Sequence, residues 1–146
     1  MNSNINSYRL ATALLLVFCA SHTIGGLLSS YDYGPPGNNV LASMKQVHFD
    51  FFGSDCSFYG FHMGFGLMVS VFLAVSAAIT WTLGNPRARA NPVVVREMRP
   101  IALALMVAYA GVTLLSWKYF FIGPLGLSAA ITILIGQGFL KSSLPQ

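Results

Sequence analysis

The chain has 146 residues, of which 55% are hydrophobic and only 8% are charged. A soluble domain carries about 25% charged residues, so this composition excludes an ordinary water-soluble globular protein and indicates membrane residence. The formal net charge is +4, but the basic residues gather in one segment between apolar runs. That pattern is typical of membrane topology, and we expect no nucleic-acid partner.

Four apolar runs predict four membrane-spanning helices, at residues 8–28, 58–83, 101–121 and 125–140. The first run is long enough to cross a bilayer, at roughly 31 Å, and we interpret it as a retained helix rather than a cleaved signal peptide. The predicted fold class is all-α, an integral membrane four-helix bundle with up-down topology. Residues 1–146 are expected to form a single transmembrane domain.

The longest predicted loop, residues 29–57, contains the sequence Gly34-Pro35-Pro36-Gly37. This sequence predicts a sharp, non-helical turn. Residues 40–52 then show helical periodicity, which favours a short amphipathic helix on the membrane surface or across the end of the bundle. An irregular loop with scattered aromatic residues is the alternative.

The loop predicted at residues 87–99 is rich in arginine and interrupted by prolines. We expect Arg99-Pro100 to open the third helix and Gly123-Pro124 to form a tight turn before the fourth. Basic loops stay on the cytoplasmic side, so both termini are predicted to be cytoplasmic in an inner membrane. The residues assigned to topology or to lipid contact are Arg87, Arg89, Arg96 and Arg99.

The segment from residue 53 to residue 66 contains an acid, a thiol, a phenol and an imidazole close together. Read as a helix, it places Asp55, Tyr59, His62 and Gly66 on one stripe. The residues expected to permit close helix packing are Gly60, Gly64 and Gly66. A leucine at position 64 is therefore predicted to disturb packing more than a leucine at position 138.

Two histidines lie at similar predicted depth, His22 on the first helix and His62 on the second. Ionisable residues inside a membrane suggest function, although a neutral histidine bonded to a neighbouring helix is the commoner case. We predict that both helices touch there and that His22, Asp55, Tyr59 and His62 line one outer-leaflet pocket. Two such imidazoles can bind haem, another metal or a quinone. The identity of any bound metal is unknown.

Short motifs along the chain resemble a family of small bacterial four-helix integral membrane proteins to which no activity is assigned. The resemblance implies the four-helix fold and no particular function. It is carried by Ser21-His22-Thr23-Ile24-Gly25-Gly26, Phe52-Gly53, Ser57-Phe58-Tyr59, Gly64-Phe65-Gly66, Arg99-Pro100 and Ser116-Trp117-Lys118-Tyr119-Phe120-Phe121.

No nucleophile elbow, zinc-protease helix or phosphate loop occurs in the sequence, so an enzyme is disfavoured. A proton-coupled transporter would need a carboxylate within the membrane, and every carboxylate here lies in a loop or at a helix edge. We therefore expect a structural or accessory subunit that acts through helix–helix association. The alternative is binding of a quinone, lipid or haem between the first two helices. The expected partners are the lipid bilayer and either further copies of the chain or a larger membrane complex.

Overall fold

The computed structural model describes residues 6–141, and it is 83% helical. Four of the described helices are long and apolar enough to cross a membrane: Ser7–Leu28, Phe58–Leu83, Pro92–Tyr119 and Ile122–Lys141. The predicted helical class and the multi-pass character are thus confirmed. The chain divides into two compact units, with residues 1–19 and 73–146 in unit 1 and residues 20–72 in unit 2. The prediction of a single domain stays a prediction.

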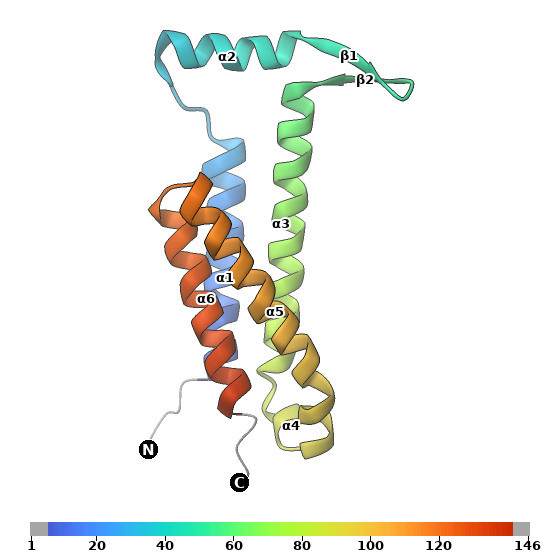
Figure 1. The fold of residues 1–146 in the computed structure, drawn as a ribbon, viewed down its shortest axis with the longest axis vertical. Coiled ribbons are helices and arrows are strands. Elements are labelled where there is room, and N and C mark those ends of the chain that lie inside the picture. The colour runs from blue at the N-terminus through green and yellow to red at the C-terminus, as the bar shows by residue number, and fades with distance from the viewer. Residues whose placement is uncertain (1–5, 142–146) are drawn as a thin grey trace. The chain divides into compact units, whose positions relative to one another are not determined.

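Unit 1 contains α1 (Ser7–Ala20), the second half of α3 (Phe58–Leu83), α4 (Pro86–Arg89), α5 (Pro92–Tyr119) and α6 (Ile122–Lys141). Helices α5 and α6 run antiparallel and side by side (Figure 1). Each of the four long helices contributes side chains to one apolar core. Its members are Tyr8, Ala11, Leu15, Phe18, Leu73, Ala77, Leu83, Ala102, Tyr109, Ile131 and Ile135.

A buried hydroxyl pair crosses this core between α1 and α3. The Thr12 hydroxyl lies 3.0 Å from the Thr80 hydroxyl and also donates to the Tyr8 carbonyl oxygen at 2.9 Å. Thr80 in turn donates to the carbonyl oxygen of Ser76 at 2.9 Å. Hydroxyls that bond to their own helix and to a neighbour satisfy their polar atoms without water, which suits a helix interface in lipid.

Helix α5 begins at Pro92, nine residues before the predicted start, so most of the predicted arginine loop is helical. The Asn91 side chain caps the helix by accepting from the backbone N–H of Val93 at 3.0 Å. Proline fits the first position because its missing N–H would have no helical partner there. Pro100 therefore lies inside α5 rather than at its start.

The predicted Gly123-Pro124 turn is also wrong, because α6 already begins at Ile122. The connection between α5 and α6 consists of Phe120 and Phe121. Pro124 lies in the first turn of α6, where its ring and absent N–H are tolerated. The Ser128 hydroxyl donates to the carbonyl oxygen of Pro124 at 2.7 Å, one turn earlier in the same helix.

Unit 2 contains η1 (Ser21–Leu28), α2 (Gly34–Gln46), β1 (His48–Phe51), β2 (Ser54–Ser57) and the first half of α3. The expected short helix exists, but it starts at Gly34 and ends at Gln46. The Gly-Pro-Pro-Gly sequence was wrongly predicted to be non-helical, because its prolines occupy the first turn of α2. Asp32 supports this start by accepting from the Gly34 N–H at 2.9 Å.

An antiparallel hairpin replaces the second part of the predicted amphipathic helix. Strands β1 and β2 pair from His48 opposite Ser57 to Phe51 opposite Ser54. The two loop residues between them, Phe52 and Gly53, have φ angles of 52° and 81°. Two consecutive positive φ values are typical of the tight turns that match the twist of a two-stranded hairpin.

The segment η1 is a π-helix that continues α1 without a break in the helical run. Its last turn closes through the backbone N–H of Ser29, which bonds to the Ile24 carbonyl oxygen five residues earlier at 3.0 Å. The hydroxyls of Ser29 and Tyr31 donate to the carbonyl oxygens of Ile24 and Gly25, each at 2.7 Å. π-Helical turns are rare and are often found at functional sites. The residues of η1 are therefore candidates for a functional site.

Candidate functional site

Within unit 2, η1 packs against α3 through a polar seam. His22 Nε2 lies 3.0 Å from the carbonyl oxygen of Gly66, and the Thr23 hydroxyl donates to the Ser70 hydroxyl at 2.7 Å. A carbonyl oxygen can only accept, so Nε2 must carry the proton of this imidazole. The structure therefore brings His22 against the second membrane helix, in agreement with the predicted contact between the first two helices.

Gly66 permits the closest approach in this seam. A Cβ atom at position 66 would lie 2.8 Å from Leu27 Cδ1 and 3.1 Å from Leu27 Cγ. These distances are too short for ordinary carbon–carbon contact, so a larger residue at position 66 would require the Leu27 side chain to move. Of the three glycines predicted to mediate packing, Gly66 is the one that does so between helices in this unit.

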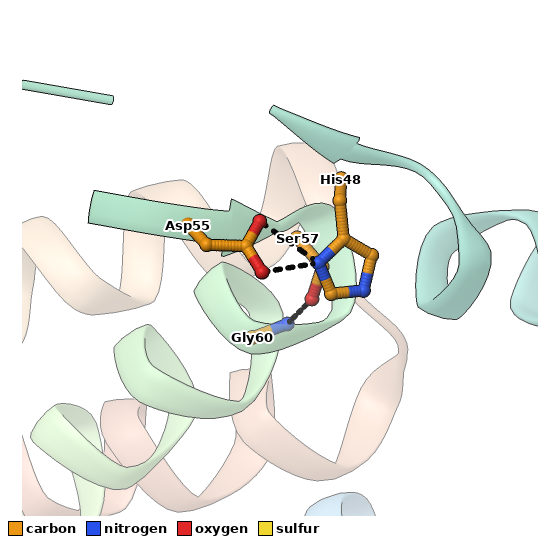
Figure 2. A network of polar contacts seen from close by, with 4 residues as sticks. All are labelled: His48, Asp55, Ser57 and Gly60. Carbon is orange, nitrogen blue, oxygen red and sulfur yellow. Dashed lines mark hydrogen bonds and ion pairs between the residues drawn. The ribbon is translucent and has the colours of Figure 1, made fainter. Parts of the chain in front are cut away.

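Asp55 is not on the predicted helical stripe, because it lies in β2 and α3 starts at Phe58. Its carboxylate instead pairs with His48, whose Nδ1 lies 3.0 Å from both carboxylate oxygens (Figure 2). The pair joins diagonal positions of the two hairpin strands, and both side chains are well exposed, at 55% and 75%. Sequence reasoning did not find His48 as the partner because the hairpin register was not predicted.

Figure 2 also shows the hydrogen bond that begins α3. The Ser57 hydroxyl accepts from the backbone N–H of Gly60 at 3.1 Å, which is the contact of a helix N-cap. A Cβ atom at Gly60 would lie 3.3 Å from this hydroxyl. Gly60 therefore supplies the backbone N–H of the helix cap and leaves room for the Ser57 hydroxyl. The sequence had predicted that Gly60 packs against another helix.

Tyr59 and His62 are neighbours on α3, with ring centroids 6.4 Å apart. The Lys45 ammonium lies 4.7 Å from the centre of the Tyr59 ring, while His62 is exposed. The four candidate ligand residues thus occupy three places. His22 contacts Gly66, Tyr59 and His62 are ring neighbours, and Asp55 pairs with His48.

A row of phenylalanines holds the hairpin against the start of α3. The Phe49 ring lies 4.9 Å from Phe58 and 5.6 Å from Phe61, measured between centroids. Phe51 and Phe65 also contact Phe61, at 5.7 Å and 6.1 Å. Tilted and edge-to-face aromatic pairs at these distances are favourable, so the hairpin is tied to the helix by apolar contacts.

Metal ligation finds little support in the described residues. No group of three or more His, Cys, Asp or Glu side chains lies together within residues 6–141. Cys19 and Cys56 are not joined in a disulfide. The Nε2 atom of His22 is a donor to Gly66 in this arrangement, so it cannot at the same time present a lone pair to iron or zinc.

The outer surface of α3 in unit 2 carries a shallow apolar hollow. Its volume is about 380 Å³, and its lining consists of Gly64, Leu67, Met68, Val71 and Phe72. A Cβ atom at Gly64 would meet no atom within 4 Å. Within the protein fold, Gly64 is therefore an open notch and not a packing glycine.

Gly138 shows the opposite behaviour in unit 1. A Cβ atom there would lie 2.6, 2.7 and 2.9 Å from three carbons of the Tyr8 ring, which is 3% exposed. The predicted order of sensitivity is therefore wrong for the fold itself. Position 138, and not position 64, is where a larger side chain has no room.

Three arginines of unit 1 contact aromatic rings. The Arg9 guanidinium carbon lies 3.2 Å from the Trp81 ring centre, and Nε donates to the Gly84 carbonyl oxygen at 3.3 Å. Arg89 lies over Tyr8 at 5.9 Å, and Arg99 lies over Phe139 at 4.9 Å. The sequence predicted Arg89 and Arg99 as topology or lipid residues but gave no sign of their aromatic partners.

Comparisons with known protein families, with curated proteins and with solved structures each found no match to this chain. Function is therefore inferred from the residues and contacts described above.

Proposed function

We propose that this protein is a structural or accessory subunit of a membrane complex, and that it binds an apolar transmembrane helix of a partner subunit through the hollow on α3. It is a multi-pass membrane protein by its four apolar helices. We further propose an up-down bundle in a bacterial inner membrane with both termini in the cytoplasm, on the basis of the arginine-rich connection between α3 and α5.

The observation that carries this proposal is the hollow itself. Met68, Val71 and Phe72 are 51%, 59% and 62% exposed, and they line the hollow along α3 beside the open position at Gly64. Lipid tails are as apolar as these side chains, so association in a membrane depends on close fit more than on hydrophobicity. A notch between large side chains provides such a fit for a ridge on another helix.

The ligand-binding alternative is less well supported by the contacts. Neither the α3 hollow nor the small cavity in unit 1 is lined by His22, Asp55, Tyr59 or His62. His22 and Asp55 already have hydrogen-bond partners within the chain. Binding of quinone, lipid or haem by these residues stays a prediction.

A pair of leucine substitutions tests the proposed role. Gly64→Leu fills the notch, whereas Gly111→Leu places the same side chain on α5, where a Cβ atom likewise meets nothing within 4 Å. Both variants should fold and should melt close to the parent protein. After mild solubilisation of native membranes, the parent and Gly111→Leu should migrate in a complex with a partner, and Gly64→Leu should migrate without it.

The proposal fails if Gly64→Leu keeps the partner at the parent's stoichiometry. It also fails if the parent chain leaves the membrane alone or only with copies of itself. Quantitative mass spectrometry of the excised bands distinguishes these outcomes. The topology is tested separately with reporter fusions, where a periplasmic reporter should be active near Asn38 and silent near Asn91.

A further inference from the structure

The charges of the chain are unevenly divided between its two units. Unit 1 contains seven of the eight lysines and arginines, but of the four acidic residues it contains only Glu97. Most of these cations lie where α1 and α5 begin and where α3 and α6 end. Such an excess of positive charge needs an external counter-ion if no partner exists within the protein.

Two of the arginines line a small cavity at this end. The cavity has a volume of about 20 Å³ and is bounded by Arg89, Arg99 and Tyr8 together with apolar side chains. The apolar members of the lining are Leu83, Val95, Met98 and Ala102. A space of this size admits one water-sized group, such as a single oxygen of a phosphate.

Aromatic rings orient both guanidinium groups. Arg89 lies over the Tyr8 ring and Arg99 over the Phe139 ring, at 5.9 Å and 4.9 Å. Stacking occupies the flat face of a guanidinium and leaves its in-plane N–H donors available. Within residues 6–141, neither guanidinium group forms a hydrogen bond or an ion pair.

Glu97 does not neutralise these cations. It is exposed, and the ion pair of the described chain joins His48 to Asp55 in unit 2. On a helix, side chains one or two positions apart do not face each other, so Glu97 is poorly placed for Arg96 and Arg99. In the part of the chain that the structure describes, the in-plane donors of Arg89 and Arg99 therefore have no acceptor of their own.

We propose that Arg89 and Arg99 bind the phosphate of an anionic phospholipid, with one phosphate oxygen at the mouth of the cavity. Guanidinium groups suit phosphate because their N–H donors match its oxygens in pairs. A lipid is favoured over a free anion because its acyl chains would contact exposed apolar side chains of α5 outside the cavity, such as Val93 and Ile101. Basic pockets between membrane helices bind lipid head groups in this way.

The test uses the full-length protein, delipidated in a neutral detergent and titrated with dioleoyl-phosphatidylglycerol or with dioleoyl-phosphatidylcholine. Native mass spectrometry counts the bound lipids and gives the affinity. The parent should bind one phosphatidylglycerol tightly and phosphatidylcholine weakly. Arg89→Gln with Arg99→Gln should weaken phosphatidylglycerol binding about 30-fold, at about 1 kcal/mol per arginine near an anionic lipid.

The matched control is Arg87→Gln with Arg96→Gln, which removes the same charge from two exposed arginines that do not line the cavity. This control should change the affinity by less than about threefold. An equal loss in both double variants would show diffuse attraction to anionic lipid and would overturn the site. Inorganic phosphate at the same concentration should not compete, and full competition would show an anion site without lipid specificity.

A lysine variant covers the case in which the glutamine variant does not fold. Arg89→Lys with Arg99→Lys keeps both charges but loses the planar donors, so it should fold and bind about tenfold more weakly than the parent. Parent-like affinity in this variant would show that charge alone is recognised, and the proposed phosphate geometry would be wrong.

Discussion

The tight contact between Gly138 and Tyr8 predicts a measurable penalty for the smallest possible change, Gly138→Ala. The new Cβ atom would lie 2.6–2.9 Å from three ring carbons, where relaxed carbon atoms are about 3.5–4.0 Å apart. The Tyr8 ring would have to move by about 1 Å within the core. Overpacking of this kind costs about 1–3 kcal/mol.

Alanine is also a better helix former than glycine by up to about 1 kcal/mol, so this substitution has a stabilising contribution that partly offsets the overpacking. Gly111→Ala isolates that gain, because a Cβ atom at position 111 meets nothing within 4 Å. Gly138→Ala should therefore be less stable than Gly111→Ala by about 1–3 kcal/mol. Reversible unfolding of both variants in mixed micelles measures the difference, and a difference below about 0.5 kcal/mol would refute the packing of Tyr8 on α6.

Three further predictions concern single hydrogen-bonded groups. Ser57→Ala removes the cap of α3 and should destabilise the protein by about 1 kcal/mol, whereas Ser57→Asp should retain most of the stability; equal loss in both would contradict the cap. Thr12→Val breaks the buried bond to Thr80 at 3.0 Å and should cost about 0.6 kcal/mol in micelles, so an unchanged midpoint would show that the hydroxyls do not interact. Hydrogen bonds from the Asn38 side chain and the Gly34 N–H hold the pKa of Asp32 below its ordinary value of 3.8. Their contribution is therefore complete above that value and is lost as the pH falls through the lowered pKa. The protection of backbone amides at the start of α2, corrected for intrinsic exchange, should decrease only below about pH 3.8, and a decrease beginning near neutral pH would exclude Asp32 as the cause.

The ends of α3 show what local sequence signals can predict. Its predicted bounds, residues 58–83, agree with the structure at both ends. Ser57 supplies a cap before an apolar run, and Gly84 with Pro86 ends the run, so each boundary has a local chemical cause. The predicted bounds of the first membrane helix also agree to within one residue.

Three of the errors in the fold share one physical cause. Proline was read as an interruption at Pro35, Pro92 and Pro124, yet each lies in the first turn of a helix. A proline that breaks a helix interior is equally able to start one, and only the preceding residues distinguish the two cases. At α5 the distinguishing signal was Asn91, a good capping residue directly before Pro92.

The candidate site was predicted in part. The predicted contact between the first two membrane helices agrees with the hydrogen bond between His22 and Gly66, while the predicted common pocket stays a prediction. The partner of Asp55 was missed because His48 reaches it through strand pairing, and the turn between the strands lacks the usual Asn-Gly sequence. Gly64 and Gly138 were ranked wrongly because the contacts of a glycine depend on neighbouring elements that its own sequence does not specify.

Site-specific photocrosslinking from two valines of α3 tests the proposed association most directly. Val71 lines the hollow and is 59% exposed, whereas Val69 is 43% exposed and lies outside the hollow. With a photoreactive amino acid at each position in living cells, position 71 should form an adduct with an apolar transmembrane peptide of a second protein. The Gly64→Leu substitution should abolish that adduct, and position 69 should give mainly lipid adducts. Lipid adducts alone at position 71, or an adduct that persists with Gly64→Leu, would contradict the proposed role of this face.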